Sequence, residues 1–261
     1  SGLTGRLDGV AVAGEGRFGL TAAGAIETAS AFLKTGAFDI AKLVRLWPKS
    51  LAPGGRVWIA ENITAGTLTE ADFEFQQTAG APMKVSGSFA GKDLAIRYWP
   101  PLPPVTGVSG RGRFFDDVIE IKVDRGVIGA MKTNQATVRI YDLGAKREMI
   151  AVDSAVQGPA DALLTILNRP PLRYAEWLGI DPTKARGAVD GRIKLKFPLI
   201  DALQMADIDL VATGAIAKAF VPKAVNGWDL AAKRLAIMVT PQQLDVGGVG
   251  TLLDQPVSFD G

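Results

Sequence analysis

Alternation of apolar and polar residues along most of the chain is the feature that most limits how it can fold. It is clearest in residues 119–123 (Ile-Glu-Ile-Lys-Val) and 193–197 (Ile-Lys-Leu-Lys-Phe). The same pattern recurs in residues 73–75, 94–98, 138–140, 208–210 and 235–239. A period of two is typical of strands with one buried face. Because turn-forming glycine and aspartate residues separate these runs, the sequence predicts a mainly β fold built on an antiparallel sheet.

Helical periodicity occurs in two places. Residues 40–47 place their apolar side chains on one stripe, and Asp39 is suited to cap the N-terminus of this helix. A shorter helix is predicted just before it, over residues 29–34. The second place is residues 159–167, where a proline suits the first turn, followed by a further helical stretch over residues 172–178. The sequence therefore predicts two short helical pairs.

These helical pairs suggest an internal repeat. A shift of about 131 residues lays residues 29–33 over residues 160–164. In each copy a bend that contains Pro and Gly, at 53–55 or 182–187, then leads into a series of strands. We therefore expect an elongated, curved antiparallel sheet, a β-groove, with a two-fold internal repeat. The predicted helix-plus-sheet units are residues 1–157 and 158–261.

The predicted strands leave a large apolar face to be covered. Two short helical pairs are too small to cover the inward faces of about ten or more strands. One alternative is a twisted sandwich or barrel, in which this face closes on itself as an ordinary core. The other is a curved sheet whose concave face holds a ligand with long hydrocarbon chains. Alternation shows which residues share a face, but it does not distinguish these two forms.

Composition removes most catalytic and metal-binding chemistry. The 261 residues include neither cysteine nor histidine, so thiolate nucleophiles, imidazole bases and the commonest transition-metal ligands are missing. The 29 basic residues nearly balance the 27 acidic ones, and no basic run is long enough to follow a phosphate backbone. We therefore expect a protein that is not an enzyme and that binds no cofactor, metal or nucleic acid.

Some motifs resemble functional sites but are better explained as strands and turns. The segment Gly14–Gly19 matches the dinucleotide-binding pattern by letter, yet no helix is expected to begin after it. The segment Gly107–Gly112 lacks the Lys-Ser or Lys-Thr end of a phosphate-binding loop and is typical of a bent strand. Asp116 and Asp117 stand between two strand-like runs, where a hairpin needs such residues. The proline-rich segment 99–104 is expected to be a rigid connector.

Membrane attachment is not visible in these residues. No window approaches the ~18 consecutive apolar residues of a membrane span, and the N-terminal residues lack the features of a signal peptide. Residues 5–10 already read like the middle of a strand-and-turn pattern. We therefore expect the chain to be a piece of a longer protein, with any anchor outside it.

Several stretches without chemistry of their own fit together as a family pattern. In the first half they are residues 46–48, 56–63, 66–68 and 96–102. In the second half they are residues 167–174, 178–182 and Gly187. In order and spacing, these stretches resemble the central domain of the YhdP-like proteins, within the AsmA-like superfamily that includes TamB. The resemblance spans most of the chain.

The resemblance implies a periplasmic segment of a long β-groove, anchored to the inner membrane by residues outside this chain. Its implied task is to carry phospholipid between the inner and outer membranes, with the acyl chains held in the apolar groove. The alternative is a closed structural or adhesive β-domain of the cell envelope that holds no ligand. The candidate groove residues are the apolar members of the alternating runs: Ile119, Ile121, Val123, Ile193, Leu195, Phe197, Ile208, Leu210, Leu235, Ile237 and Val239.

Overall fold

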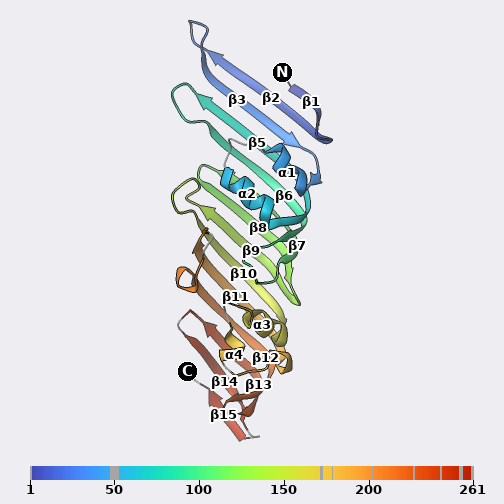
Figure 1. The fold of residues 1–261 in the computed structure, drawn as a ribbon, viewed down its shortest axis with the longest axis vertical. Helices are drawn as coiled ribbons and strands as arrows, with labels where there is room; N and C mark the ends of the chain where they lie inside the picture. The colour runs from blue at the N-terminus through green and yellow to red at the C-terminus, as the bar shows by residue number, and fades with distance from the viewer. Residues whose placement is uncertain are drawn as a thin grey trace.

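The computed structural model describes residues 2–47, 53–170, 173–177, 179–200, 203–225, 227–241, 243–252 and 255–259. Within these residues, 15 strands form one antiparallel sheet in which consecutive strands are mostly neighbours (Figure 1). The strands are β1 (Gly2–Leu7), β2 (Val10–Leu20), β3 (Ile26–Thr35), β4 (Phe38–Asp39), β5 (Ile63–Thr78), β6 (Lys84–Ile96), β7 (Val105–Phe115), β8 (Val118–Ile128), β9 (Met131–Tyr141), β10 (Met149–Pro159), β11 (Arg186–Pro198), β12 (Asp209–Val225), β13 (Trp228–Val239), β14 (Leu244–Leu252) and β15 (Gln255–Phe259). The predicted mainly β, antiparallel fold is confirmed.

Two pairs of short helices accompany the sheet. They are α1 (Ile40–Leu46) with α2 (Pro53–Asn62), and α3 (Ala160–Leu167) with α4 (Tyr174–Trp177). The sequence predicts α1, α3 and α4, whereas it does not predict α2. Two short 3-10 helices, η1 (Pro182–Lys184) and η2 (Met205–Asp207), precede β11 and β12. Asp39 caps α1, because its carboxylate Oδ1 accepts a hydrogen bond of 2.8 Å from the Ala41 N–H. The sequence prediction of this cap is confirmed.

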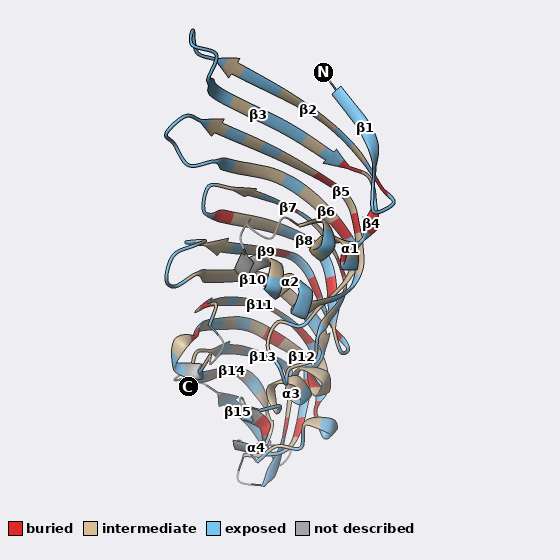
Figure 2. Ribbon diagram, turned by 45° about the horizontal axis from the view of Figure 1, so that its top comes forward, coloured by how far each residue is buried: buried red, intermediate tan, exposed pale blue. Residues whose placement is uncertain are grey.

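The sheet is a single elongated layer that bends along its strands (Figures 1 and 2). The path of paired strands runs from β1 to β15 without closing, so the described part of the sheet stays open. Its strand ends form two long edges. The turn edge, at the left in Figure 1, carries the hairpin turns 21–25, 79–83, 116–117 and 142–148. The helix edge, opposite, carries α1 to α4, and Figure 2 shows the helices on the concave side of the bend.

Strand register places the apolar residues of successive strands on the same face. A rung is a row of directly paired residues, whose side chains point to one side of the sheet. The outer rung, near the turn edge, consists of Leu33, Phe73, Gly87, Phe114, Ile119, Ile140, Ile150 and Phe197. The second rung, one step closer to the helix edge, includes Thr35, Ala71, Phe89, Gly112, Ile121, Val138, Val152, Leu195 and Leu210. These rungs lie on the concave face, because residues of the same face pack against the helices.

The convex face carries ion pairs between neighbouring strands, together with exposed apolar residues such as Val211 and Met238. The Arg113 guanidinium lies 2.6 Å from a carboxylate oxygen of Glu120, and Arg192 lies 2.5 Å from a carboxylate oxygen of Asp153. The Ser88 hydroxyl donates to Asp72 across β5 and β6 at 3.0 Å. The sheet therefore separates a hydrated, charged surface from an apolar one, as the alternation of the sequence predicts.

Among the described residues, two buried clusters join the helices to the concave face near the helix edge. In the first cluster, buried Val10, Phe38, Ile40 and Leu68 pack with residues of α1. In the second, buried Met131, Ala160 and Val189 pack with Ala162, Leu163 and Ile166 of α3. Burial in Figure 2 is concentrated beside these helices. Each helical pair therefore closes one stretch of the helix edge into an ordinary dry core.

Glycines on the concave face allow neighbouring strands to approach closely as the sheet bends. Gly191 and Gly214 are directly paired on β11 and β12. A Cβ added to Gly191 would lie 2.8 Å from the carbonyl oxygen of Thr213, and one added to Gly214 would lie 2.8 Å from the Cα of Gly191. Because backbone atoms occupy this space, any larger residue would force the two strands apart.

Some local predictions are wrong. Residues 29–34 belong to β3, not to a helix, because this segment hydrogen-bonds between β2 and β5 and its alanines do not decide its conformation. Residues 53–55 begin α2 instead of forming a bend. The shift of about 131 residues therefore lays a strand over a helix. A shift of 120 or 121 residues along the chain instead relates the buried residues of the first cluster to those of the second. It relates Val10 to Met131, Ile40 to Ala160, and Leu68 to Val189.

Other predictions agree with the structure. Gly14–Gly19 lies within β2, Gly107–Gly112 lies within β7 at a register shift, and Asp116 and Asp117 form the turn between β7 and β8. Residues 99–104 join β6 to β7. Pro48, Leu172 and Leu178 lie outside the described residues. The division into units 1–157 and 158–261 stays a prediction, and the register between β10 and β11 runs across it without a shift.

Candidate functional site

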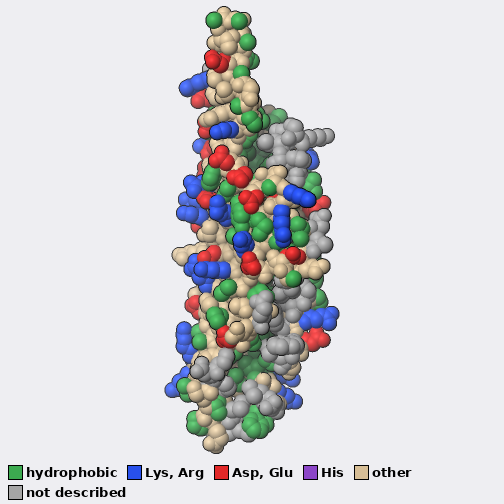
Figure 3. Space-filling model, turned by 90° about the vertical axis from the view of Figure 1, so that its left-hand side faces the viewer, with side chains coloured by type: hydrophobic (Ala, Val, Ile, Leu, Met, Phe, Trp, Pro, Cys, Tyr) green, Lys and Arg blue, Asp and Glu red, His purple; other side chains and the backbone are tan. Residues whose placement is uncertain are grey.

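The uncovered half of the concave face, between the helices and the turn edge, is the candidate site. Every residue of the outer rung is half-buried, including Leu33, Phe114 and Ile150, although the helices pack on other rungs. Figure 3 looks at the turn edge and shows hydrophobic side chains along the length of the molecule beside the charged convex side. This part of the face is an apolar groove open along one side.

Strand register places ten of the eleven predicted groove residues on this one face. Ile119, Ile121 and Val123 share it with Ile193, Leu195, Phe197 and Leu210 through the register of β7 to β12. Val239, Ile237 and Leu235 join them through the pairing of β12 with β13. Ile208 precedes β12 and has no place in the register. All are half-buried except Ile208 and Leu235, which are buried. Leu235 belongs to a closed cluster with Ala219, Leu230 and Ala232, so it is the candidate least able to meet a ligand.

Sequence reasoning missed the aromatic floor of the groove. The ring centroids of Phe73 and Phe75 lie 6.5 Å apart, and those of Phe73 and Phe114 lie 5.9 Å apart. The Phe114 ring covers Gly87 on the next strand, because a Cβ added to Gly87 would lie 2.8 Å from that ring. The only signal in the sequence is an aromatic residue opposite a glycine, and it is visible only once the register is known.

The outer rung is long enough for a lipid chain. It crosses the strands from β3 to β11 and so spans seven strand spacings, or roughly 34 Å at ~4.8 Å per spacing. One leaflet of a bilayer has acyl chains about 15 Å deep, half of a hydrocarbon core of about 30 Å. A chain lying lengthwise along the rung would therefore meet apolar side chains over its whole length.

Two buried hydroxyls on the concave face are paired with each other, and the resolved pKa shifts concern other groups. The buried hydroxyls of Thr133 and Ser154 hydrogen-bond to each other. Burial raises the pKa of the Tyr98 hydroxyl, an effect that the nearby Arg169 guanidinium partly offsets. Arg169 also donates to the Pro101 carbonyl at 3.3 Å, which ties the 99–104 connector to the segment after α3. On the convex face, the hydrogen bond from Arg192 lowers the pKa of Asp153.

The described residues offer little for metal chemistry or for crossing a bilayer with a helix. In the described ranges, no group of three or more Asp or Glu side chains is placed to hold a metal ion. Among the helices that the structure describes, none has the length and apolar character of a membrane span. What the groove supplies is apolar surface.

A family model matches most of the chain. The model described as YhdP protein matches residues 7–214, from the end of β1 to the middle of β12. The chain belongs to the YhdP family. Searches of curated proteins and of solved structures gave no significant match. The family predicted by the resemblance of the sequence is thereby confirmed.

Membership in the YhdP family and the open one-layer sheet together fit a bridge-like lipid-transport domain. The matched residues contain both helix-edge clusters and the complete outer rung. Strands β13 to β15 lie beyond the match, yet they continue the same sheet and the same concave face.

Proposed function

We propose that this chain is a segment of a bridge that carries phospholipid, with the acyl chains lying in the open half of the concave face. The observation that supports this most is the outer rung, a continuous row of half-buried residues on a sheet whose opposite face carries ion pairs. A purely structural domain would gain stability by covering that row.

Apolar contact alone is sufficient to hold a lipid in such a groove. Removal of a methylene group from water is worth about 0.8 kcal/mol, so even a partly covered acyl chain is retained without any specific pairing. The headgroup would remain in water at the turn edge, where the groove is open. Because the contacts along the outer rung are chemically similar, an acyl chain can slide from strand to strand with little change in free energy.

The proposed setting is the periplasm, between the inner and outer membranes, with an inner-membrane anchor supplied by residues outside this chain. This setting follows from the family and is part of the proposal. The competing candidate is a closed structural or adhesive domain of the envelope. The buried clusters favour a structural domain for the half of the face at the helix edge, but the outer rung, which is only half-buried, does not favour it.

A single charge in the groove tests the proposal. Ile237 faces the groove and is half-buried, whereas its neighbour Met238 points to the convex side and is 42% exposed. We expect Ile237→Asp to lose most co-purifying phospholipid. Placing an unpaired carboxylate against an acyl chain costs about 2 kcal/mol or more in free energy. The matched variant Met238→Asp should keep its lipid. Native mass spectrometry gives the lipid content and thermal unfolding gives the stability of each protein.

Two results would count against lipid carriage. One is wild-type protein that contains no lipid even after purification in mild detergent and incubation with phospholipid vesicles. The other is a severe loss of stability in Ile237→Asp without any lipid in either protein, which would place Ile237 in a closed core and favour the structural domain.

A further inference from the structure

Two neighbouring hairpins at one end of the turn edge expose large apolar side chains. The β2–β3 hairpin exposes Phe18, Leu20 and Ile26 to 70%, 61% and 56%, and the turn between β5 and β6 exposes Met83 to 51%. The two hairpins are joined, because the Ala79 N–H donates to the Glu27 carbonyl at 2.9 Å. Figure 1 shows the β2–β3 hairpin extending at the N-terminal end of the sheet. These four side chains are called the apolar tip.

The apolar tip differs in charge from other turns on the same edge. Residues 18–26 and 77–83 contain no charged side chain. In contrast, the turn at 116–117 consists of two aspartates, and the turn at 142–148 carries Asp142, Lys146, Arg147 and Glu148. The combination of strong apolar exposure and missing charge therefore distinguishes the first two hairpins from the turns at 116–117 and 142–148.

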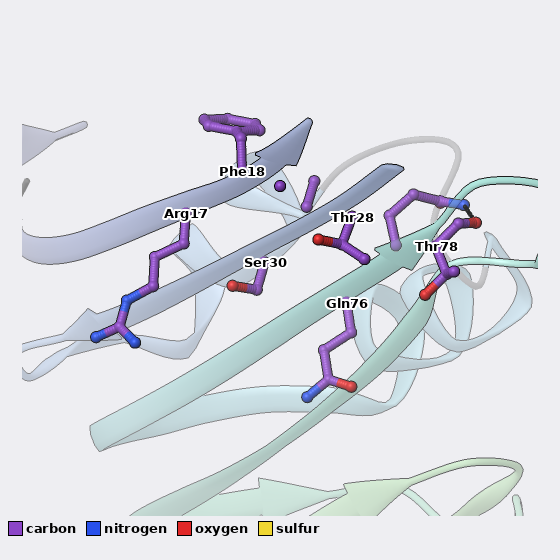
Figure 4. Close-up of a pocket in the computed structure, with 9 residues that line it drawn as sticks. Arg17, Phe18, Thr28, Ser30, Gln76 and Thr78 are labelled. Atoms are coloured by element: carbon purple, nitrogen blue, oxygen red, sulfur yellow. Dashed lines mark hydrogen bonds between the residues drawn. The ribbon is translucent and has the colours of Figure 1, made fainter. Parts of the chain in front are cut away.

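A row of polar side chains lies directly behind the tip on the convex face. Arg17, Ser30, Gln76 and Lys84 are paired in register across β2, β3, β5 and β6 and form the polar rung. Arg17, Ser30 and Gln76 line a shallow depression of about 300 Å³, together with Thr28 and Thr78. Figure 4 shows Phe18 and Arg17 on opposite sides of β2. Arg17 is close to Glu15, at 3.9 Å, but its side chain stays 80% exposed.

The spacing of the two features matches the layers of a membrane surface. Arg17 precedes Leu20 by three residues, a distance of about 10 Å in a strand at ~3.3 Å per residue. Apolar groups that bind at a membrane interface enter it by about 5–10 Å. With the apolar tip at that depth, the guanidinium of Arg17, the ammonium of Lys84 and the hydroxyls would stand among the headgroup phosphates. Glu15, which lies 3.9 Å from Arg17, and Glu27, beside the tip, offset these two cations, so the polar rung offers a phosphate hydrogen-bond donors and not a net positive charge.

We propose that the apolar tip inserts into the surface of a phospholipid bilayer and that the polar rung binds its headgroup phosphates. A protein partner would need a broad complementary surface, whereas two narrow loops with donors behind them suit a layered one. The tip is also continuous with the groove, because Phe18 pairs with Ala29 on the concave face and Ala31 pairs with Phe75 on the same side. A bilayer at the tip would therefore adjoin one end of the groove.

The absence of cysteine from the chain allows a direct test by single-site labelling. A polarity-sensitive dye on Leu20→Cys should brighten severalfold with vesicles of phosphatidylcholine and phosphatidylglycerol. The same dye on Val211→Cys, 45% exposed on the convex face, should not respond. Equal responses at the two positions, or none at Leu20, would overturn the proposal.

Binding measurements separate the tip from the groove. The variant Phe18→Ser/Leu20→Ser/Ile26→Ser should bind these vesicles at least tenfold more weakly in cosedimentation, whereas Val211→Ser/Met238→Ser/Val249→Ser, also exposed, should bind like wild type. Arg17→Gln/Lys84→Gln should lose affinity for phosphatidylglycerol vesicles and much of the salt dependence. Lipid held in the groove, counted by native mass spectrometry, should be unchanged in all. Binding of a protein through the tip without vesicle binding would contradict the inference and leave the groove proposal standing.

Discussion

The two halves of the concave face are built from the same strands but differ in what covers them. Along the helix edge, Leu68 and Val189 are buried beneath α1 and α3 in ordinary cores. Along the turn edge, Ile119 and Ile140 are equally apolar but only half-buried. The difference arises from where the helices attach, not from the composition of the strands. A single-layer sheet can therefore contain a closed core that stabilises it and an open surface that is free to bind.

The recurrence of the closed half supports this view. The same arrangement of a strand residue, a helix start and a second strand residue returns after 120 or 121 residues, as Val10, Ile40 and Leu68 and then as Met131, Ala160 and Val189. Each helical pair thus packs against its own stretch of the helix edge. The outer rung runs past both units without interruption, from Leu33 to Phe197.

The largest difference between the halves should appear when a charge is placed in each. Leu68 is 5% exposed within the first cluster, so Leu68→Asp buries an unpaired carboxylate and should cost about 4 kcal/mol or prevent folding. Ile121→Asp, in the open half, should cost about 1–2 kcal/mol, because water can reach the carboxylate. Urea unfolding followed by circular dichroism measures both. Equal losses of stability would mean that the two halves are both closed, or both open.

A smaller effect is expected at the cap of α1. Asp39 accepts the Ala41 N–H, so Asp39→Ala should lower the free energy of unfolding by about 1 kcal/mol, whereas Asp39→Asn should lower it by less. The cap belongs to the closed half, so lipid content should stay the same. The corresponding helix α3 has no side-chain cap at Pro159, which makes this effect specific to the first unit. A loss of lipid in Asp39→Ala would show that the two halves are coupled.

The smallest effect concerns pH and the convex face. The hydrogen bond from Arg192 lowers the pKa of Asp153 below its ordinary value of 3.8. A lowered carboxyl pKa stabilises the fold at pH values above that ordinary value, and this contribution is lost as the pH falls below about 4. Because both side chains are partly exposed, the change should be smaller than that at Asp39. Thermal unfolding of wild type and Asp153→Asn from pH 6 to pH 3 should converge at the acid end, and a difference that grows towards low pH would contradict this assignment.

Alternation in the sequence was sufficient to predict the sheet, its antiparallel character and the shared face of the groove candidates. The runs at 119–123 and 193–197 keep a strict period of two, and strand pairing preserves it. The helix at 40–46 could be predicted because Asp39 and the apolar stripe act locally. These features need no knowledge of distant neighbours.

Features that depend on distant pairing could not be predicted. The segment 29–34 has local helical character, but its place between β2 and β5 makes it a strand. The partner of Gly87 is Phe114, and only the register brings this aromatic ring over the glycine. Whether Leu235 meets a ligand or lies in a cluster likewise depends on strands that pair later in the chain. Periodicity assigns a face, while burial on that face is decided by tertiary structure.

Photo-crosslinking from single positions tests most directly whether the open half holds lipid. A benzophenone amino acid at Ile119 or Ile140 would lie on the outer rung, and one at Lys122 or Arg139 would lie on the convex face of the same strands. After incubation with radiolabelled phospholipid vesicles and illumination, the account predicts lipid adducts at Ile119 and Ile140 and background at Lys122 and Arg139. Adducts of equal yield on both faces, or none on the outer rung while the protein remains folded, would contradict it.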